Sequence, residues 1–390
     1  MRRVRLKEIG TFYRGLSGKS KSDFSEGNAL LVTYRNIFNN PVLNPAIKDT
    51  VVVGKDEKQN EVLWGDILIT GSSETPADAG MSSVVLFNPQ EKMYLNSFCF
   101  GFRLNDMNEA LPSYIGHLLR STSIRAAISK TAFGVTRFNV NRMRFADIEI
   151  PLPPLNIQKE IVSILDSFTS LIGKMKQEVE MRKKQMEYYR EKLMAPQTNW
   201  KIKTLGEIGT FTRGNGLQKS DFRVKGFPCV HYGQIHTYYN TCIYKTKSFC
   251  EEDLAKKLQK ASYGDLLIAT TSEDVKACCK AAVWFGAGDV AYSGDSFCYS
   301  HDQDPKYMAY LFQTEMFAKQ KQKAATGAKV IRVSGESMAS FSFAFPPLVQ
   351  QRQIASILDT FETYISKLEK MIELRQKQYE YYREKLLTFE

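Results

Sequence analysis

The sequence predicts a mixed α+β fold: two globular domains separated by two long antiparallel coiled-coil helices, related by a pseudo-two-fold internal repeat. The first observation is that Leu6–Gly15 (LKEIGTFYRG) returns almost unchanged as Leu205–Gly214 (LGEIGTFTRG). The second is that Ser163–Leu193 returns as Ser356–Leu386 with more than half of its positions identical. The third is that apolar residues in both later segments recur every seven positions, as in a coiled coil. Such a chain presents two copies of one surface and suits a two-fold or tandem partner.

Landmarks between these segments fix the register of the repeat. Ser97–Phe100 (SFCF) matches Ser296–Tyr299 (SFCY), and further along the chain Gly134 matches Gly327. The second copy is therefore expected to be six residues shorter somewhere after Arg103 and before Gly134, in a surface loop.

The two copies do not resemble each other equally along their length. Between Gly15 and Gly65 little of the sequence is shared with the second copy, whereas the segment that starts at Ser163 has stayed alike. We interpret the alike part as having a shared task and the divergent part as having a different target in each copy. Neutral drift of loops is the alternative.

Residues 1–152 are predicted to form the first globular domain. Short strand-like runs (ALLVTY, DTVVVG, DILIT and SSVVLF) alternate with turns rich in Gly, Asn, Asp and Pro. Apolar residues at helical spacing indicate a helix near Leu111–Thr131. Residues 196–345 are predicted to form the second domain on the same plan, with runs such as FPCVHYG, DLLIAT and AAVWFG and a helix around Lys306–Ala324.

Each globular domain ends in a proline signal, IPLPPLNIQ at Ile150–Gln158 and FPPLVQQ at Phe345–Gln351. Because proline is tolerated at the start of a helix and not inside one, a long helix is expected to follow each signal. The predicted helical segments are residues 153–195 and residues 346–390.

Both helical segments carry a heptad seam. Its residues are Ile172, Met175, Val179, Met186, Tyr189 and Leu193 in the first helix, and Ile365, Leu368, Ile372, Tyr379, Tyr382 and Leu386 in the second. Arg182 and Arg375 occupy the same interior slot, where a charge weakens packing but can fix register.

Two such similar seams most simply pack on each other. An antiparallel pair would place one globular domain at each end. A helix of roughly 38 residues spans about 57 Å, and this length would set the distance between the two domains. The alternative is that each helix packs only on its own globular domain.

The composition favours an anionic partner. The net charge is +11 and the pI is about 9.1, which suits nucleic acid first and a membrane surface second. No apolar run approaches the roughly 18 residues that span a bilayer, and the N-terminal MRRVRLKEIG lacks the apolar stretch of a signal peptide. We therefore expect a soluble, cytoplasmic protein.

The cysteines do not indicate a metal site or a disulfide framework. They are Cys99, Cys229, Cys242, Cys250, Cys278, Cys279 and Cys298. Their number is odd, none forms a CxxC pair, and only four histidines are available as further ligands. We expect reduced, mostly buried thiols and no bound metal.

The motifs of common enzymes are absent from the sequence. GLSGKS at Gly15–Ser20 resembles a phosphate-binding loop, but Tyr13 stands where that motif needs glycine. No GxGxxG follows a strand, and there is no HExxH, GxSxG or Asn-Pro-Pro-aromatic motif. Asp66 and Asp265 follow glycines just before a strand, where aspartate usually serves a turn. The chain is predicted to bind rather than to catalyse, with no catalytic and no cofactor-binding residues.

Basic, amide and aromatic residues cluster in the divergent loops and again just before each proline signal. Such residues suit phosphates and base edges, so we take them as candidates for DNA contact. In the first domain they are Lys19, Lys21, Tyr34, Arg35, Asn36, Arg137, Asn139, Asn141 and Arg142, and in the second they are Lys219, Arg223, Tyr232, Gln234, His236, Lys329 and Arg332. For any one of them, a solvated surface role is the competing interpretation.

Taken together, these features resemble the specificity (S) subunit of type I restriction-modification systems. The most specific marks are IPLPPLNIQKEIVSILD with its counterpart FPPLVQQRQIASILD, and the paired EYYREKL endings. TGAKVIRVS at Thr326–Ser334 also resembles the segment that closes a target recognition domain, although the first copy has Phe133 in place of the threonine. The resemblance covers essentially the whole chain, in the order target recognition domain, spacer helix, target recognition domain, spacer helix.

The resemblance implies a mechanism. Each target recognition domain would read one half of a bipartite site in double-stranded DNA, and the coiled coil would set the spacer. Two modification (M) subunits would dock on the helices and methylate adenine after base flipping, and restriction (R) subunits would translocate and cleave DNA. S-adenosylmethionine (SAM), ATP and Mg²⁺ are expected on those partners and not on this chain.

Two other functions compete with this interpretation. A self-sufficient methyltransferase or nuclease would need a SAM loop or an acidic metal cluster, and the sequence has neither. A stand-alone coiled-coil DNA-binding or scaffold protein without an enzyme partner would need only the basic loops and the helices.

Overall fold

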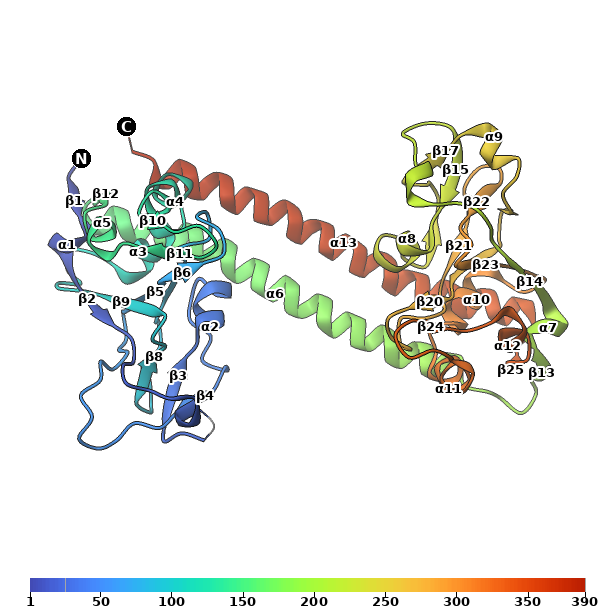
Figure 1. Cartoon of the computed structure of the whole chain (residues 1–390), viewed down its shortest axis with the longest axis horizontal. Helices are drawn as coiled ribbons and strands as arrows, with labels where there is room; N and C mark the ends of the chain where they lie inside the picture. The colour runs from blue at the N-terminus through green and yellow to red at the C-terminus, as the bar shows by residue number, and fades with distance from the viewer. Residues whose placement is uncertain (25, 390) are drawn as a thin grey trace. The chain divides into compact units, whose positions relative to one another are not determined.

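The computed structural model describes residues 1–24 and 26–389. The chain divides into two compact units, which are described separately (Figure 1). Unit 1 comprises Met1–Lys176 and Lys370–Glu390, and unit 2 comprises Gln177–Glu369. Each unit therefore combines one globular domain with part of both long helices, α6 (Leu155–Leu193) and α13 (Leu348–Leu387).

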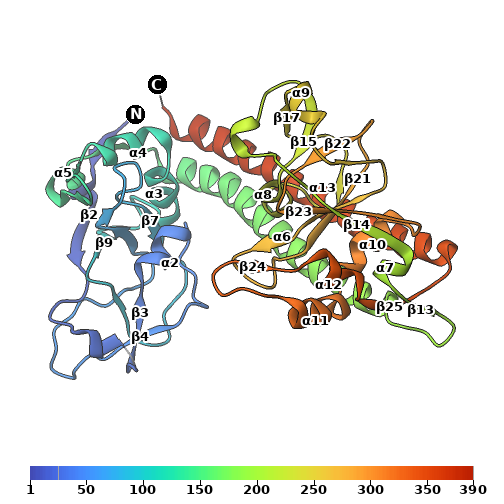
Figure 2. The same ribbon diagram turned by 45° about the vertical axis from the view of Figure 1, so that its right-hand side comes forward.

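Unit 1 is built on a four-stranded antiparallel sheet in the order β2-β9-β5-β7, next to a three-stranded sheet in the order β4-β3-β8. Its strands are β1 (Arg3–Arg5), β2 (Gly10–Arg14), β3 (Ala29–Val32), β4 (Asp49–Val51), β5 (Ile67–Thr70), β6 (Ser72–Ser73), β7 (Ser82–Val84), β8 (Met93–Leu95), β9 (Cys99–Leu104), β10 (Ala132–Phe133), β11 (Phe138–Val140) and β12 (Glu149–Pro151). Its shorter helices are α1 (Leu6–Ile9), η1 (Lys21–Phe24), α2 (Tyr34–Asn39), α3 (Pro112–Leu119), α4 (Thr122–Ser129) and α5 (Arg142–Ala146). Strand β5 is buried throughout, as its apolar run predicts, and α3 packs beside β7 (Figure 2).

Unit 2 repeats this plan with a five-stranded sheet in the order β14-β23-β19-β21-β16 and a four-stranded sheet in the order β17-β15-β22-β18. Its strands are β13 (Lys201–Thr204), β14 (Gly209–Arg213), β15 (Phe227–Val230), β16 (Cys242–Ile243), β17 (Ser248–Cys250), β18 (Lys260–Ala261), β19 (Leu266–Ala269), β20 (Thr271–Ser272), β21 (Lys280–Trp284), β22 (Val290–Tyr292), β23 (Ser296–His301), β24 (Ile331–Arg332) and β25 (Ser342–Phe345). Its shorter helices are α7 (Leu205–Ile208), η2 (Lys219–Asp221), α8 (Tyr232–Thr237), α9 (Glu252–Ala255), α10 (Pro305–Leu311), α11 (Glu315–Ala324) and α12 (Gly335–Ala339).

The mixed α+β fold with repeated globular domains and two long helices is confirmed, but the helix expected in each domain is broken in two. In unit 1 the break between α3 and α4 falls at Ser121, whose backbone is extended. In unit 2 it falls before α11 at Thr314, which is also extended and accepts the backbone N–H of Phe317 with its side chain. The expected continuous helices are wrong because apolar spacing continues across an extended Ser or Thr at the N-cap position of a new helix.

The strand ladders also correct the position of the length difference between the copies. Phe102 of β9 pairs with Phe12, and Tyr299 of β23 pairs with Phe211. Because Phe12 and Phe211 are the same position of the repeat, Phe102 rather than Phe100 corresponds to Tyr299. Two of the six missing residues therefore precede β23, and four are missing from the loop between β23 and α10. The expectation of one six-residue difference is wrong. It relied on local sequence similarity, whereas the hydrogen-bond register of the strands decides which residues of the two copies are equivalent.

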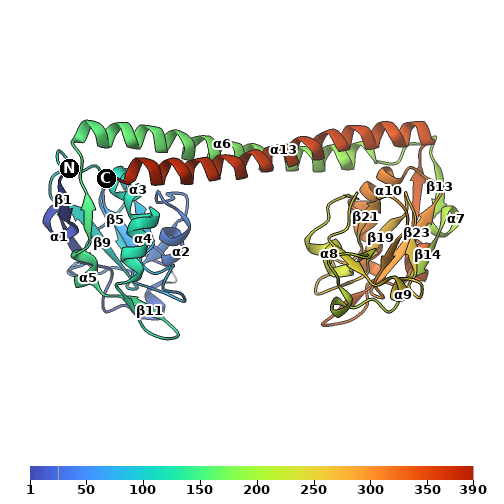
Figure 3. The same cartoon turned by 90° about the horizontal axis from the view of Figure 1, so that it is seen from above.

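The two long helices pack on each other in both units. In unit 1 the start of α6 lies beside the end of α13, where the rings of Phe168 and Tyr382 stack at 5.5 Å between centroids (Figure 3). In unit 2 the end of α6 lies beside the start of α13, where Tyr189 and Phe361 stack at 5.6 Å. These contacts are equivalent under the repeat, and they show that the helices run antiparallel within each unit.

Half of the predicted seam residues are buried, and one of these contacts a globular domain. The buried members are Ile172, Met175, Val179, Ile365, Leu368 and Tyr379, the partly exposed ones are Met186, Tyr189, Leu193, Ile372 and Leu386, and Tyr382 is exposed. Tyr379 contacts a globular domain, because its hydroxyl lies 3.2 Å from Nδ1 of His117 in α3. The alternative in which each helix packs only on its own domain is wrong, since α13 packs its end into the core of unit 1.

The repeated SILD segment attaches α6 and α13 to the globular domains. Asp166 in α6 accepts a hydrogen bond from Nε2 of His117 at 2.8 Å. The equivalent Asp359 in α13 accepts one from the hydroxyl of Tyr310 at 2.8 Å. His117 and Tyr310 occupy the same position of the repeat, so different donors hold the same carboxylate in the two units.

Candidate nucleic-acid interface

The segment just before each proline signal forms a short hairpin against the globular domain. In unit 1, β10 and β11 pair with each other, and β11 pairs with β6 so that Asn139 lies opposite Ser72. In unit 2, β24 pairs with β20 so that Arg332 lies opposite Thr271. The same backbone arrangement therefore presents a different side chain in each unit.

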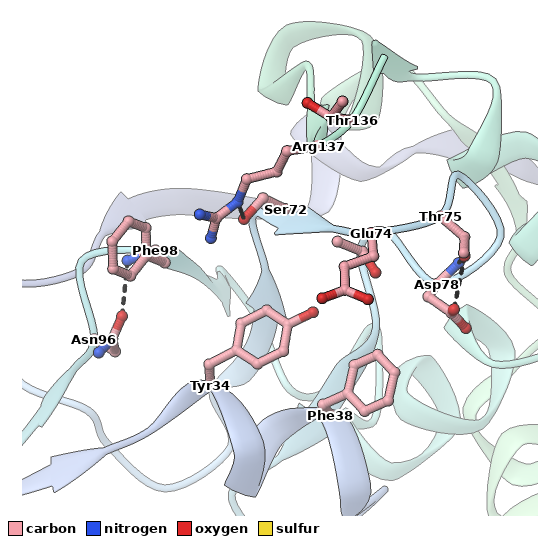
Figure 4. A pocket seen from close by; sticks show the side chains of 11 residues that line it. Tyr34, Phe38, Ser72, Glu74, Thr75, Asp78, Asn96, Phe98, Thr136 and Arg137 are labelled. Carbon is pink, nitrogen blue, oxygen red and sulfur yellow. Dashed lines mark hydrogen bonds between the residues drawn. The ribbon is translucent and has the colours of Figure 1, made fainter. Parts of the chain in front are cut away.

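A groove of about 630 Å³ lies beside the hairpin in unit 1 (Figure 4). Its lining combines aromatic rings, hydroxyl groups, carboxylates and one guanidinium. The lining residues are Tyr34, Phe38, Ser72, Ser73, Glu74, Thr75, Asp78, Asn96, Phe98, Thr136 and Arg137.

Arg137 is held in place at the edge of this groove. Its Nε donates to the hydroxyl of Ser72 at 3.1 Å, and its guanidinium lies 5.1 Å from the ring centroid of Phe98. Among the described residues, its two terminal nitrogens have no hydrogen-bond partner. An arginine oriented in this way keeps a free donor pair, which is the geometry that binds guanine or phosphate.

The opposite side of the groove is aromatic and acidic. The rings of Tyr34 and Phe38 stack at 5.7 Å, and burial raises the pKa of the Tyr34 phenol. The carboxylate of Glu74 lies above Tyr34, while Asp78 accepts the hydroxyl of Thr75 at 2.6 Å (Figure 4). The groove is therefore of mixed charge, and its carboxylates can accept the amino groups of cytosine or adenine.

A basic side chain, buried in unit 2 and partly exposed in unit 1, holds the loop that corresponds to the one carrying these carboxylates. In unit 1, Arg125 of α4 donates to the backbone carbonyls of residues 77, 79 and 80. In unit 2, Nζ of Lys321 in α11 donates to the carbonyls of Lys276 and Cys278 at 2.9 and 2.8 Å. Burial lowers the pKa of both side chains. The two cations come from different positions of the repeat, yet they hold the same loop.

Several candidate residues of unit 1 are already used by the fold. Asn36 is buried and bonds the backbone of Asn44 through its side chain, and Asn141 caps α5. Lys19 forms an ion pair with Glu57. Arg142 lies 5.2 Å from the ring centroid of Phe100, and burial lowers its pKa. The exposed candidates are Lys21, Arg35, Arg137 and Asn139, and Tyr34 is partly exposed.

The same division holds in unit 2. Arg223 pairs with Glu251 at 2.8 Å and bonds two carbonyls of its own loop. Gln234 bonds the backbone N–H of His231 and the hydroxyl of Ser248, and His236 bonds the carbonyl of Thr271 through Nε2. Lys219, Lys329 and Arg332 are exposed, and Tyr232 is partly exposed.

Sequence reasoning did not identify the loop from Ser72 to Asp78, the ring of Phe98, or the roles of Arg125 and Lys321. A signal was present, because Ser73-Glu74 returns as Ser272-Glu273 at the spacing of the repeat. The predicted turn role of the aspartates is confirmed: Asp66 accepts the N–H of Leu63, and Asp265 accepts that of Ser262, both at 2.8 Å.

The cysteines are free thiols; Cys242 is partly exposed and the other six are buried. Burial raises the pKa of Cys99 to about 12 and that of Cys242 to about 11, which keeps both protonated. Over residues 1–24 and 26–389, no group of three or more His, Cys, Asp or Glu side chains could hold a metal ion. None of the helices in these ranges is both long and apolar enough to cross a membrane.

Comparison with known proteins gives consistent matches. Residues 1–181 and 197–376 each match the type I restriction modification DNA specificity domain. A putative type I restriction enzyme specificity subunit of Haemophilus influenzae is 30% identical over 272 residues, which are 66% of this chain and 68% of that protein. A type I restriction enzyme specificity subunit of Escherichia coli is 28% identical over 256 residues, 62% of this chain and 63% of that protein.

Solved structures show a similar fold. The S subunit of a type I restriction-modification system from M. genitalium aligns with a TM-score of 0.58 and 15% identity, over 100% of this chain and 96% of that one. A chain from a study of complex assembly and conformational transition in a type I system aligns with a TM-score of 0.62 and 15% identity, over 99% of this chain and 97% of that one.

Proposed function

Because this chain belongs to the type I restriction-modification DNA specificity family, we propose that it selects a bipartite, asymmetric DNA sequence for a partner methyltransferase. Each target recognition domain would read one half-site, and the spacer between the half-sites would depend on the length of the two long helices. Family membership favours this role over that of a stand-alone scaffold.

The repeated hairpin and loop are the observation that carries this proposal. Both units place an exposed hairpin beside a loop that contains a Ser-Glu pair, but the exposed side chains differ, with Arg137 and Asn139 in unit 1 and Lys329 and Arg332 in unit 2. One scaffold with two sets of polar side chains suits the reading of two different half-sites.

Exposed cations away from the hairpins support contact with the DNA backbone. Lys21 and Arg35 in unit 1 and Lys219 in unit 2 are exposed. Binding of the chain to DNA should therefore weaken as salt rises, with log K falling linearly against log salt because phosphate contacts release counterions. If the DNA affinity measured by fluorescence anisotropy did not change with salt, these residues would not be contacts to the DNA backbone.

The long helices support docking of one modification subunit on each unit. Large apolar side chains are exposed at equivalent positions of both helices, with Tyr188 58% and Tyr381 61% exposed. Unit 1 exposes Ile164 and Leu171 of α6 with Leu374 and Tyr381 of α13, and unit 2 exposes Met181 and Tyr188 of α6 with Ile357 and Tyr364 of α13. These two sets correspond residue for residue under the repeat, so two copies of one partner would find the same surface.

The partners would supply the chemistry. The modification subunits would bind SAM and methylate adenine, and the restriction subunits would use ATP and Mg²⁺. Replacing Leu374 and Tyr381 by glutamate should reduce the number of bound modification subunits from two to one in analytical ultracentrifugation. Lys370→Glu is the control, because it places a carboxylate at an exposed position of the same helix. If two modification subunits still bind to this double variant, the surface is not their docking site.

The deciding experiment maps methylated adenines across a genome that expresses the modification subunit with and without this chain. A bipartite motif that depends on the chain would establish the role and give both half-sites. If methylation does not depend on the chain while the modification subunit is expressed and folded, the scaffold function replaces this proposal.

A further inference from the structure

The two hairpins share a backbone that glycine makes possible. Gly134 and Gly327 have φ values of +132° and +104°, a region that other residues rarely adopt. A Cβ at Gly134 would lie 2.0 Å from the carbonyl oxygen of Arg137, and one at Gly327 would lie 2.1 Å from that of Val330. The chain turns back in the same way in both units, so the residues that follow these glycines occupy matching places.

The side chains on this shared backbone differ at every one of the next five positions. They are Val135, Thr136, Arg137, Phe138 and Asn139 in unit 1, and Ala328, Lys329, Val330, Ile331 and Arg332 in unit 2. The neighbouring loop keeps its Ser-Glu pair in both units. The hairpin therefore differs between the units at each of these five positions, whereas the neighbouring loop retains this pair.

The loop beside each hairpin is fixed before any ligand binds. Arg125 in unit 1 and Lys321 in unit 2 donate hydrogen bonds to its carbonyl groups. In unit 1 the loop in turn holds the hairpin. The Ser72 hydroxyl accepts a hydrogen bond from Nε of Arg137, and Ser72 lies opposite Asn139 in the paired strands β6 and β11. A side chain that is oriented in the free protein discriminates better, since less conformational freedom is lost on binding.

The chemistry of the unit 1 hairpin matches the edges of base pairs. Arg137 offers two free nitrogens of one planar fork, which suit O6 and N7 of guanine. Asn139 is exposed and can serve adenine, and Val135, which is 89% exposed, can contact the methyl group of thymine. In unit 2, Lys329 and Arg332 place two cations on the hairpin, so a different base preference is expected.

We propose that the hairpin residues 135–139 and 328–332 determine which bases each unit selects, with Arg137 as the principal base-reading residue of unit 1. This inference rests on the proposed function and deepens it, because it assigns the difference between the half-sites to these residues. Arg125 and Lys321 act as positioning residues that hold the adjoining loop.

The test exchanges the hairpin of unit 1 for that of unit 2. The variant V135A/T136K/R137V/F138I/N139R is expressed with the modification subunit, and its methylation motif is compared with that of the unchanged chain. We expect altered bases in one half-site and an unchanged second half-site. Lys58→Val is the control, because it removes an exposed charge of the same unit outside the hairpin; it should leave both half-sites unchanged.

A milder variant decides the question if the exchange impairs folding. Arg137→Lys keeps the charge and loses the planar fork, so the preference for the matched base over a substituted base should fall by about 10-fold or more in methylation of paired oligonucleotides. Chain-dependent methylation with an unchanged motif and unchanged base preference would overturn the inference and leave the proposed function standing. Absence of any chain-dependent motif with the unchanged chain would instead overturn the proposed function.

Discussion

Glu384, near the end of α13, accepts the backbone N–H of Thr122 with both carboxylate oxygens, at 3.0 and 2.9 Å, where α4 begins. The equivalent Glu191, near the end of α6, accepts the N–H of Glu315 at 3.2 Å with both oxygens, where α11 begins. The first N–H groups of a helix have no partner within it, and the helix dipole favours a negative charge there. In each unit, the repeat thus uses the end of one long helix to cap a short helix.

Glu384→Gln should destabilise unit 1 by about 1 kcal/mol, because the cap of α4 loses its charge. Hydrogen exchange at the start of α4 should accelerate, while α11 in unit 2 stays unchanged. Glu380→Gln, an exposed position on the same helix, should leave α4 unaffected. Equal protection of α4 in the variant and in the unchanged chain would show that the contact contributes nothing.

Gln158 fastens the first turn of α6 to the globular domain. Its side chain is fully buried, accepts the N–H of Leu111 at 2.9 Å, and donates to the carbonyls of Glu109 and Pro153 at 2.9 and 2.8 Å. Gln158→Ala should lower the free energy of unfolding by about 3 kcal/mol, because it leaves buried backbone groups without partners. Urea unfolding measures this loss, and the exposed Lys159→Ala should change stability by less than about 0.5 kcal/mol. Similar values for both variants would refute the role of Gln158.

Cys279 has a φ of +62°, and it is the only residue other than glycine with positive φ among those described. Gly80 occupies the equivalent position in unit 1 with a φ of +67°. Cys279→Gly should therefore be more stable than Cys279→Ala by about 1 kcal/mol, the reverse of the usual order. At Cys278, whose φ is not positive, alanine should be the more stable of the same two substitutions. Thermal unfolding of the four variants tests this, and equal ordering at both positions would exclude backbone strain.

His301 should make unit 2 sensitive to acid. Burial lowers the pKa of its ring, Nδ1 accepts the N–H of Gln303 at 3.2 Å, and the buried Nε2 has no partner among the described residues. The pKa of His301 is therefore lower in the folded protein than in the unfolded chain, where it is about 6.5. The stability that depends on the neutral ring is fully present above this unfolded pKa, and it is lost as the pH falls through the folded pKa.

The strand ladders place Leu104 of unit 1 at the position of His301. His301→Leu should therefore reduce the loss of stability between about pH 7.5 and about pH 5.5, as measured by urea unfolding. Some dependence should remain, because burial also lowers the pKa of His231. An unchanged slope would show that His301 does not drive the acid sensitivity.

Much of the fold could be predicted from sequence because the evidence was local or internal to the chain. The internal repeat, the proline signals before α6 and α13, and the heptad spacing of Ile172, Val179 and their counterparts each predicted features that the structure confirms. The candidate site was predicted only in part. Arg137 and Arg332 were identified from residue type and position, whereas Glu74 and Arg125 were not, because their roles depend on contacts with distant segments.

The sequence by itself determined the duplication, the two long helices, the basic charge and the segments that differ between the copies, because identity and periodicity are read along the chain. Only the tertiary structure decided that α13 packs its end into unit 1 and that the ladder aligns Phe102 with Tyr299. It also decided that Asn36 and Gln234 serve the fold while Arg137 stays exposed. These outcomes depend on which backbone groups, far apart in the sequence, form hydrogen bonds with each other. That pairing decides which side chains remain at the surface.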